Sequence, residues 1–186
     1  MSSVVISGDT SGAITLAAPA VSGTNTATLP AATGTVMVSG NMPAFSAYAS
    51  GGGTTVISNG VFTKVTLNAK TFDTNSCFDA VTNYRFTPNV AGYYQINATV
   101  ESNWNTSQFS LFAVYIYKNG SSYSRTQLYE AVSAQIYGGI TNSNLIYMNG
   151  TTDYLELYVI TSSGVSVGYD QGSPNTYMTG YLVRAA

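Results

Sequence analysis

The chain of 186 residues contains no histidine, charged residues make up only 8 % of it, and Cys77 is its one cysteine. Without histidine, the commonest general base and nitrogen metal ligand are missing, so Ser-His-Asp, Cys-His and zinc sites are excluded. One cysteine excludes an intrachain disulfide and favours a buried thiol, with an interchain bridge as the alternative. A carboxylate pair is the catalytic option that is left. Because the eight acidic residues show no informative spacing, we expect no enzyme, catalytic residue, metal ligand or cofactor.

The few charges also restrict the partners. The net charge is −2 and no Lys/Arg cluster exists, so we do not expect nucleic acid as a partner. No stretch approaches the ~20 apolar residues of a membrane span. The N-terminus lacks the basic region and apolar core of a secretory signal, so we expect synthesis in the cytoplasm without export. The surface must consist mainly of Ser, Thr, Asn, Gln and Tyr.

Residues 1–42 differ from the rest of the chain, since Asp9 is their one charge and Gly, Ala, Ser and Thr dominate. Short strand-like pieces at 13–16, 26–29 and 35–38 are separated by proline and glycine. A disordered leader is one interpretation. We favour an extended arm that folds against copies of itself or a larger assembly, because its apolar pieces are regularly punctuated. Its candidate anchoring residues are Ile14, Leu16, Leu29 and Val36.

Residues 43–186 show many short strands divided by turn signals and no convincing helix. The Asn119-Gly120 and Asn149-Gly150 pairs predict hairpin turns, and Gly51 to Gly53 predicts a loop. The pattern predicts an all-β, two-sheet jelly-roll sandwich. Its expected strands are 61–67, 93–101, 109–118, 123–129, 132–137, 144–148, 154–161, 165–169 and 177–184.

Two of these strands are apolar on both faces, whereas a sandwich strand normally has one wet face. In 109–118, Leu111, Ala113, Tyr115 and Tyr117 alternate with Phe112, Val114 and Ile116. A strand covered by a loop is one explanation. We favour a subunit interface, since tyrosine can bury its ring and still satisfy its hydroxyl. The predicted interface residues are Phe112, Val114, Ile116, Tyr154, Tyr158, Ile160 and Tyr181.

Five short motifs occur in the order found in the complement-q globular head, which shares its jelly roll with the tumour necrosis factors. The resemblance covers residues 43–186 and implies a homotrimer. Some members bind calcium, which leaves Asp79 and Asp170 as candidate loop ligands. The motifs are 43–48 (PAFSAY), Phe78-Asp79, 86–88 (FTP), 92–94 (GYY) and 180–182 (GYL).

The text of residues 14–35 resembles a module of tailed-bacteriophage fibre and virion proteins, where it precedes a distal domain. The resemblance implies a virion protein whose arm, residues 1–42, contacts other virion proteins, and whose head, residues 43–186, is displayed for host attachment. One alternative is a capsid decoration or head-fibre protein with a mainly structural role. A second alternative is a glycan-hydrolysing tail spike.

A host-surface glycan is the ligand that the aromatic and amide residues favour. Exposed rings beside amide side chains offer stacking together with hydrogen bonds, which suits sugars. Loop packing and interface burial remain the role that we favour for these side chains over receptor contact. The candidate receptor residues are Trp104, Asn103, Asn105, Tyr169 and Asp170.

Overall fold

The computed structural model describes residues 3–21, 23–28, 31, 33–34, 36–103, 111–129, 137–162 and 167–186. It divides into two compact units, Met1–Gly34 and Thr35–Ala186. The division falls inside the arm predicted at 1–42, and the second unit contains the predicted head.

The first unit contains an antiparallel hairpin of β1 (Ser3–Ser7) and β2 (Ala13–Ala17). The strand predicted at 13–16 is therefore present. The described parts of the other two predicted pieces, 26–28 and 36–38, are not strands. Val4 pairs with Leu16 and Ile6 with Ile14, so these four side chains share one apolar face. A two-stranded hairpin alone is marginally stable in water, so this face needs a partner.

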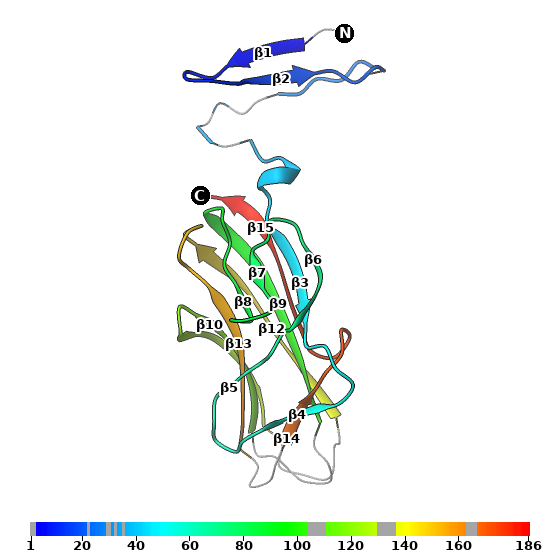
Figure 1. The fold of residues 1–186 in the computed structure, drawn as a ribbon, viewed down its shortest axis with the longest axis vertical. Coiled ribbons are helices and arrows are strands. Elements are labelled where there is room, and N and C mark those ends of the chain that lie inside the picture. The colour runs from blue at the N-terminus through cyan, green and yellow to red at the C-terminus, as the bar shows by residue number, and fades with distance from the viewer. Residues whose placement is uncertain are drawn as a thin grey trace. The chain divides into compact units, whose positions relative to one another are not determined.

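The head is a sandwich of two antiparallel sheets, which Figure 1 shows as two layers. Within the described residues one sheet has seven strands, and β9 lies at its centre between β12 on one side and β15 and β14 on the other. Its strands are β3 (Ala44–Tyr48), β4 (Thr54–Ile57), β6 (Ala69–Asp73), β9 (Gly92–Asn103), β12 (Tyr137–Met148), β14 (Val167–Asp170) and β15 (Tyr177–Ala185).

The other sheet has six strands within the described residues, in the order β11-β10-β13-β8-β7, with β5 also paired to β13. A 3₁₀ turn, η1 (Ser39–Asn41), precedes the head's first strand. The strands of this sheet are β5 (Thr63–Lys64), β7 (Phe78–Asp79), β8 (Arg85–Phe86), β10 (Leu111–Lys118), β11 (Ser121–Leu128) and β13 (Leu155–Ser162).

The core lies between the two sheets and follows from the alternation of each strand. Phe45 and Phe86 stack with ring centroids 4.3 Å apart, and Tyr94 meets Phe86 edge-on at 5.4 Å. The buried Tyr94 hydroxyl donates a hydrogen bond to the Val90 carbonyl at 2.7 Å, which satisfies the polar end of the ring. Gly180 packs so closely that a Cβ atom would lie 2.7 Å from the Phe45 ring.

The predicted strands of the head are largely confirmed, including the strand that begins after Gly92. Asn119 and Gly120 both have positive φ angles, 53° and 77°, and form the predicted turn between β10 and β11. The prediction over 61–67 shortens to β5, and most of 132–137 lies outside the described residues. The expected strands included none at β3, β4, β6 or β7.

Candidate functional site

The two apolar sides of β10 have different surroundings. Phe112, Val114 and Ile116 are fully buried in the core between the sheets. The prediction that these three side chains form a subunit interface is therefore wrong, because their own chain already covers them.

The remaining predicted interface residues lie on two different surfaces. Tyr158 and Ile160 lie on the outward face of the six-stranded sheet, since their neighbours Leu157 and Val159 point into the core. Tyr154 lies on the same side. Tyr181 lies on the outward face of the seven-stranded sheet and is 52 % exposed. The structure does not bring these residues together.

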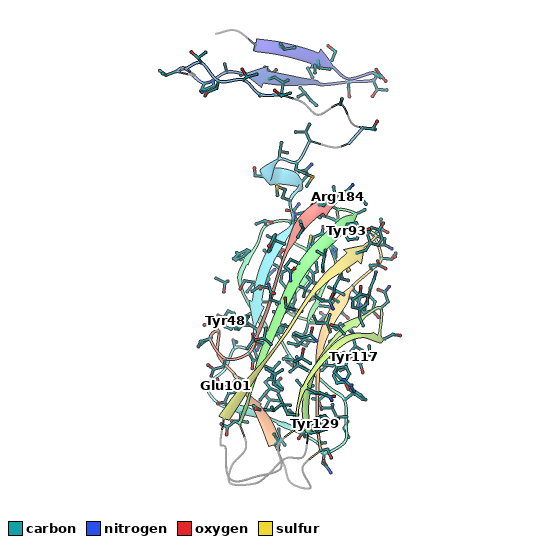
Figure 2. The ribbon with its side chains drawn as sticks, turned by 180° about the vertical axis from the view of Figure 1, so that it is seen from behind. Tyr48, Tyr93, Glu101, Tyr117, Tyr129 and Arg184 are labelled. Carbon is teal, nitrogen blue, oxygen red and sulfur yellow. The ribbon has the colours of Figure 1, made fainter. Side chains whose placement is uncertain are left out.

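The outward face of β9, β12 and β15 combines exposed apolar residues with amides and hydroxyls, and we call it the amide–tyrosine face. The Tyr93 and Tyr147 rings lie 5.4 Å apart across the β9–β12 pair. Figure 2 shows Tyr93 near one end of β9 and Glu101 toward the other. The face comprises Tyr93, Gln95, Asn97, Thr99, Thr141, Ser143, Leu145, Tyr147 and Tyr181.

Hydrogen bonds join the polar members of this face. The Gln95 amide donates to the Ser143 hydroxyl at 2.9 Å, and Ser143 donates to Asn97 Oδ1 at 2.7 Å. The hydroxyls of Thr99 and Thr141 lie 2.9 Å apart. These polar groups partner one another, so the face can be covered without leaving them all unsatisfied.

Four rings on the outward face of the six-stranded sheet form a second surface, the aromatic patch: Phe62, Tyr115, Tyr117 and Tyr158. Tyr117 and Tyr158 stack at 4.2 Å, and Phe62 meets Tyr115 edge-on at 5.2 Å. Phe62 belongs to the segment before β5, so a loop residue partly covers β10. The alternative explanation for the two apolar faces of β10, that a loop covers one of them, therefore holds for part of its outward face.

The structure brings two of the predicted receptor residues, Asn103 and Asp170, together and buries a third, Tyr169. Asn103 Nδ2 donates to Asp170 Oδ1 at 2.8 Å, and Thr54 Oγ1 donates to the same oxygen at 2.7 Å. Tyr169 is fully buried, and its hydroxyl accepts a hydrogen bond from the Thr66 N–H. The prediction for Tyr169 is therefore wrong, because the neighbouring strand positions point to opposite faces. The predicted receptor residues Trp104 and Asn105 lie outside the described residues.

Several carboxylates organise turns. Asp79 accepts hydrogen bonds from the backbone N–H groups of Thr82 and Val81, which hold its pKa well below the usual value. Burial raises the pKa of Asp153, but hydrogen bonds from Asn119 and Lys118 outweigh that effect and leave it lowered. Among the described residues, no three or more His, Cys, Asp or Glu side chains are grouped for a metal ion.

Cys77 is buried, and desolvation raises the pKa of its thiol. This agrees with the expectation of a buried thiol. Over the described part of the chain, no helix has the length and apolar character to span a membrane.

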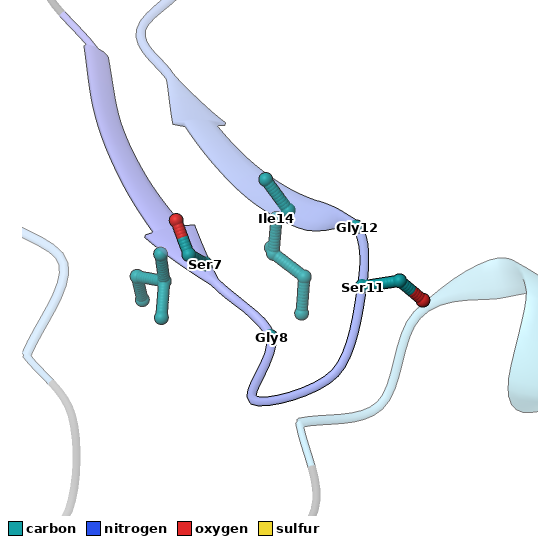
Figure 3. Close-up of a pocket in the computed structure, with 7 residues that line it drawn as sticks. Ser7, Gly8, Ser11, Gly12 and Ile14 are labelled. Atoms are coloured by element: carbon teal, nitrogen blue, oxygen red, sulfur yellow. The ribbon is translucent and has the colours of Figure 1, made fainter.

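The predicted anchoring residues Ile14 and Leu16 are exposed on the hairpin, and Val36 is also exposed. Leu29 lies outside the described residues. A hollow of about 270 Å³ lies beside the hairpin turn, and its lining includes Gly8, Ser11 and Gly12 (Figure 3). Its lining contains no ionisable side chain, so it offers shape, backbone groups and the hydroxyls of Ser7 and Ser11.

The fold resembles those of tumour-necrosis-factor-like and complement heads. Eiger TNF from S. frugiperda matches 78 % of this chain and 95 % of its own, with a TM-score of 0.62 and 6 % identity. Murine APRIL matches 76 % and 99 %, with a TM-score of 0.57 and 9 % identity. The globular domain of zebrafish complement 1qA matches 77 % and 99 %, with a TM-score of 0.53 and 16 % identity.

These similarities confirm the predicted jelly roll, and at such low identity they show the fold alone. No protein-family model matches the sequence, and no curated protein matches it either.

Sequence reasoning missed Phe62 and the pairing of Tyr93 with Tyr147. The alternation of β9 placed Tyr93 on its outward face, but the register against β12 was needed to bring Tyr147 opposite. Phe62 lies within the strand predicted at 61–67, but the structure shortens that strand to β5 and leaves Phe62 in the irregular segment before it.

Proposed function

We propose that this chain is a structural virion protein of a tailed bacteriophage, whose head forms a homotrimer displayed for attachment to the host surface. The proposal excludes catalysis as the main role. The resemblance of residues 14–35 to a phage fibre module supports the virion context. The amide–tyrosine face is the observation that carries the self-association.

Self-association through this face follows from what one chain leaves exposed. Leu145, Tyr147 and Tyr181 are 49 %, 41 % and 52 % exposed, and they lie on adjoining parts of one sheet. Contiguous exposed apolar surface of this kind is typical of interaction sites. Across β9, β12 and β15, Glu101 and Arg184 are the charged residues, so a copy can approach at little electrostatic cost.

A cyclic trimer requires that each subunit offer two different patches, one of which contacts the other on the next copy. The amide–tyrosine face is one patch in this proposal. In this proposal the amide–tyrosine face takes the place of Phe112, Val114 and Ile116 as the subunit interface. Of the interface residues predicted from the sequence, Tyr181 lies on this face.

The hairpin of β1 and β2 is the proposed virion anchor. Its face of Val4, Ile6, Ile14 and Leu16 is exposed in the single chain and carries no charge. A β-rich virion partner can cover this face and supply the further strands that an isolated hairpin needs.

Antibody labelling of phage particles viewed by electron microscopy tests the virion assignment. We expect labelling at a tail or fibre tip, and purified full-length protein is expected to reduce phage adsorption to host cells. Labelling over the whole capsid without an effect on adsorption identifies a decoration protein. Absence of the chain from particles contradicts the proposal.

An assay for new reducing ends on host polysaccharide tests the non-enzymatic part. We expect none after prolonged incubation. Release that disappears when one carboxylate is replaced by its amide contradicts this part and identifies a hydrolytic tail spike.

A further inference from the structure

The aromatic patch lies on the outward face of the six-stranded sheet, away from the amide–tyrosine face. Phe62 is 47 % exposed, Tyr117 and Tyr158 are half-buried, and Tyr115 is buried beneath them, so three of the four rings are accessible to a ligand. Ring contacts join all four members: Phe62 contacts Tyr115 and Tyr117, and Tyr117 contacts Tyr158. Such a group is a rigid platform, because each ring limits the rotation of the next.

The strand register places charges at both sides of this platform. Lys64 pairs with Tyr158, Tyr158 with Tyr115, and Tyr115 with Arg125, so these residues form one row across four strands. Directly opposed side chains of antiparallel strands share a face. The row therefore has a lysine at one end and an arginine at the other.

The two cations of this row are not equivalent. Lys64 forms an ion pair with Glu156 at 2.5 Å, so its charge is neutralised within the chain. Arg125 is exposed, and no carboxylate of the described residues lies within ion-pair distance of it. Arg125 is therefore uncommitted among the described residues, and it lies directly across from Tyr115 of the aromatic patch.

We propose that the aromatic patch and Arg125 form a binding site for an acidic saccharide that carries carboxylate groups. The apolar face of a sugar ring packs on Phe62, and the guanidinium of Arg125 accommodates the carboxylate through two parallel N–H donors. This inference rests on the proposed attachment function and specifies the class of ligand. It also assigns a different surface from that of the predicted receptor residues Asn103 and Asp170.

The tyrosine hydroxyls suit hydrogen bonds to sugar. Burial raises the pKa of both Tyr117 and Tyr158, so the phenols stay neutral and retain their donor hydrogens at physiological pH. A neutral hydroxyl both donates and accepts, which matches the hydroxyl groups of a saccharide.

Two other occupants fit less well. Nucleic acid binding normally neutralises several phosphates, whereas this row has one uncommitted cation. A second copy would have to bury Arg125 opposite a carboxylate, at a cost that the uncharged residues of the amide–tyrosine face avoid.

Titration calorimetry of the full-length chain with oligogalacturonate tests the proposal, with uncharged malto-oligosaccharide of equal length as the control sugar. We expect binding of oligogalacturonate and at least about tenfold weaker binding of the neutral sugar, the loss of one charge-assisted contact. Arg125→Gln is expected to lower the affinity for oligogalacturonate about tenfold, and Phe62→Ala by a similar factor. Arg125→Lys tests the need for the paired donors and is expected to recover only part of the affinity.

Arg184→Gln is the matched control, because it removes an exposed arginine from the other sheet with the same change in charge. An equal loss in Arg184→Gln and Arg125→Gln, or equal binding of both sugars, overturns the inference. Displacement of oligogalacturonate by an equimolar short DNA strand also overturns it. If the chain does not bind oligogalacturonate but still inhibits phage adsorption, the inference is wrong and the proposed function stands. If it neither binds oligogalacturonate nor inhibits adsorption, both the inference and the proposed function are contradicted.

Discussion

The two outward faces of the head differ although both sheets follow the same alternation. The amide–tyrosine face presents tyrosine and leucine beside hydroxyls and amides that bond to one another. The aromatic patch presents stacked rings beside an ion pair and the uncommitted Arg125. On the first face the charges lie toward the ends, where Arg184 is opposite Tyr93 and Glu101 is near the other end of β9, so a copy can cover the uncharged residues between them. The second face has charges at both sides of its rings, which favours exposure or a charged ligand.

This difference shows that an apolar strand face does not by itself indicate an interface. β10 is apolar on both sides, yet one side fills the core and the other carries the aromatic patch. The charged residues that neighbouring strands place on a surface determine whether it suits a subunit interface or a charged ligand.

The largest effect is expected from a charge placed on the amide–tyrosine face. Leu145→Lys puts a cation among the uncharged residues that lie between Arg184 and Glu101, so trimers should dissociate to monomers at micromolar concentration. Light scattering coupled to size-exclusion chromatography measures the mass. Phe62→Lys is the control, because Phe62 has almost the same exposed fraction on the other sheet, and it should leave the trimer intact. If both variants dissociate the trimer equally, the proposed difference between the two outward faces is contradicted.

The two sides of β10 should differ in their contribution to stability. Phe112→Ala leaves a cavity in the core and is expected to lower the free energy of unfolding by about 3–5 kcal/mol. Tyr117→Ala removes a half-buried ring and should cost less than half as much. Urea unfolding at one fixed protein concentration measures both, because assembly makes apparent stability depend on concentration. Equal losses contradict the assignment of Phe112 to the core.

A smaller effect is expected from acid. The pKa values of Asp79 and Asp153 are lowered in the folded chain, whereas the unfolded carboxyl groups titrate near 3.8. Their stabilisation is therefore present above pH 3.8 and is lost as the pH falls toward the folded values. Asp153→Asn should flatten this acid limb, which thermal unfolding between pH 2.5 and 6 measures. An unchanged limb in the variant contradicts this role of Asp153.

The strands and turns of the head could be predicted from the sequence better than the roles of its surface residues. The alternation around Tyr94 and the Asn119-Gly120 turn predict a strand and a hairpin because both signals are local. The assignment of Phe112, Val114 and Ile116 to an interface failed because alternation identifies two faces without saying which one meets the other sheet. Tyr169 failed because it was assigned to a loop with Asp170, whereas it lies in β14 with its side chain in the core.

The candidate sites depend on register between strands that are distant in the sequence. Arg125 and Tyr158 become neighbours only through β10, and Tyr93 meets Tyr147 only through the pairing of β9 with β12. Asn103 and Asp170 were both predicted as receptor residues, yet their hydrogen bond joins positions 67 residues apart. No local pattern specifies these contacts.

Covalent labelling of tyrosine by iodination, read by mass spectrometry on the full-length chain at assembling concentration, tests the central claim most directly. Tyr147, Tyr181 and Tyr123 are 41 %, 52 % and 48 % exposed in the single chain, and Tyr123 lies on the six-stranded sheet. If copies associate through the amide–tyrosine face, Tyr147 and Tyr181 will be protected while Tyr123 is labelled. Protection of Tyr123 with free labelling of Tyr147 and Tyr181 would contradict the account.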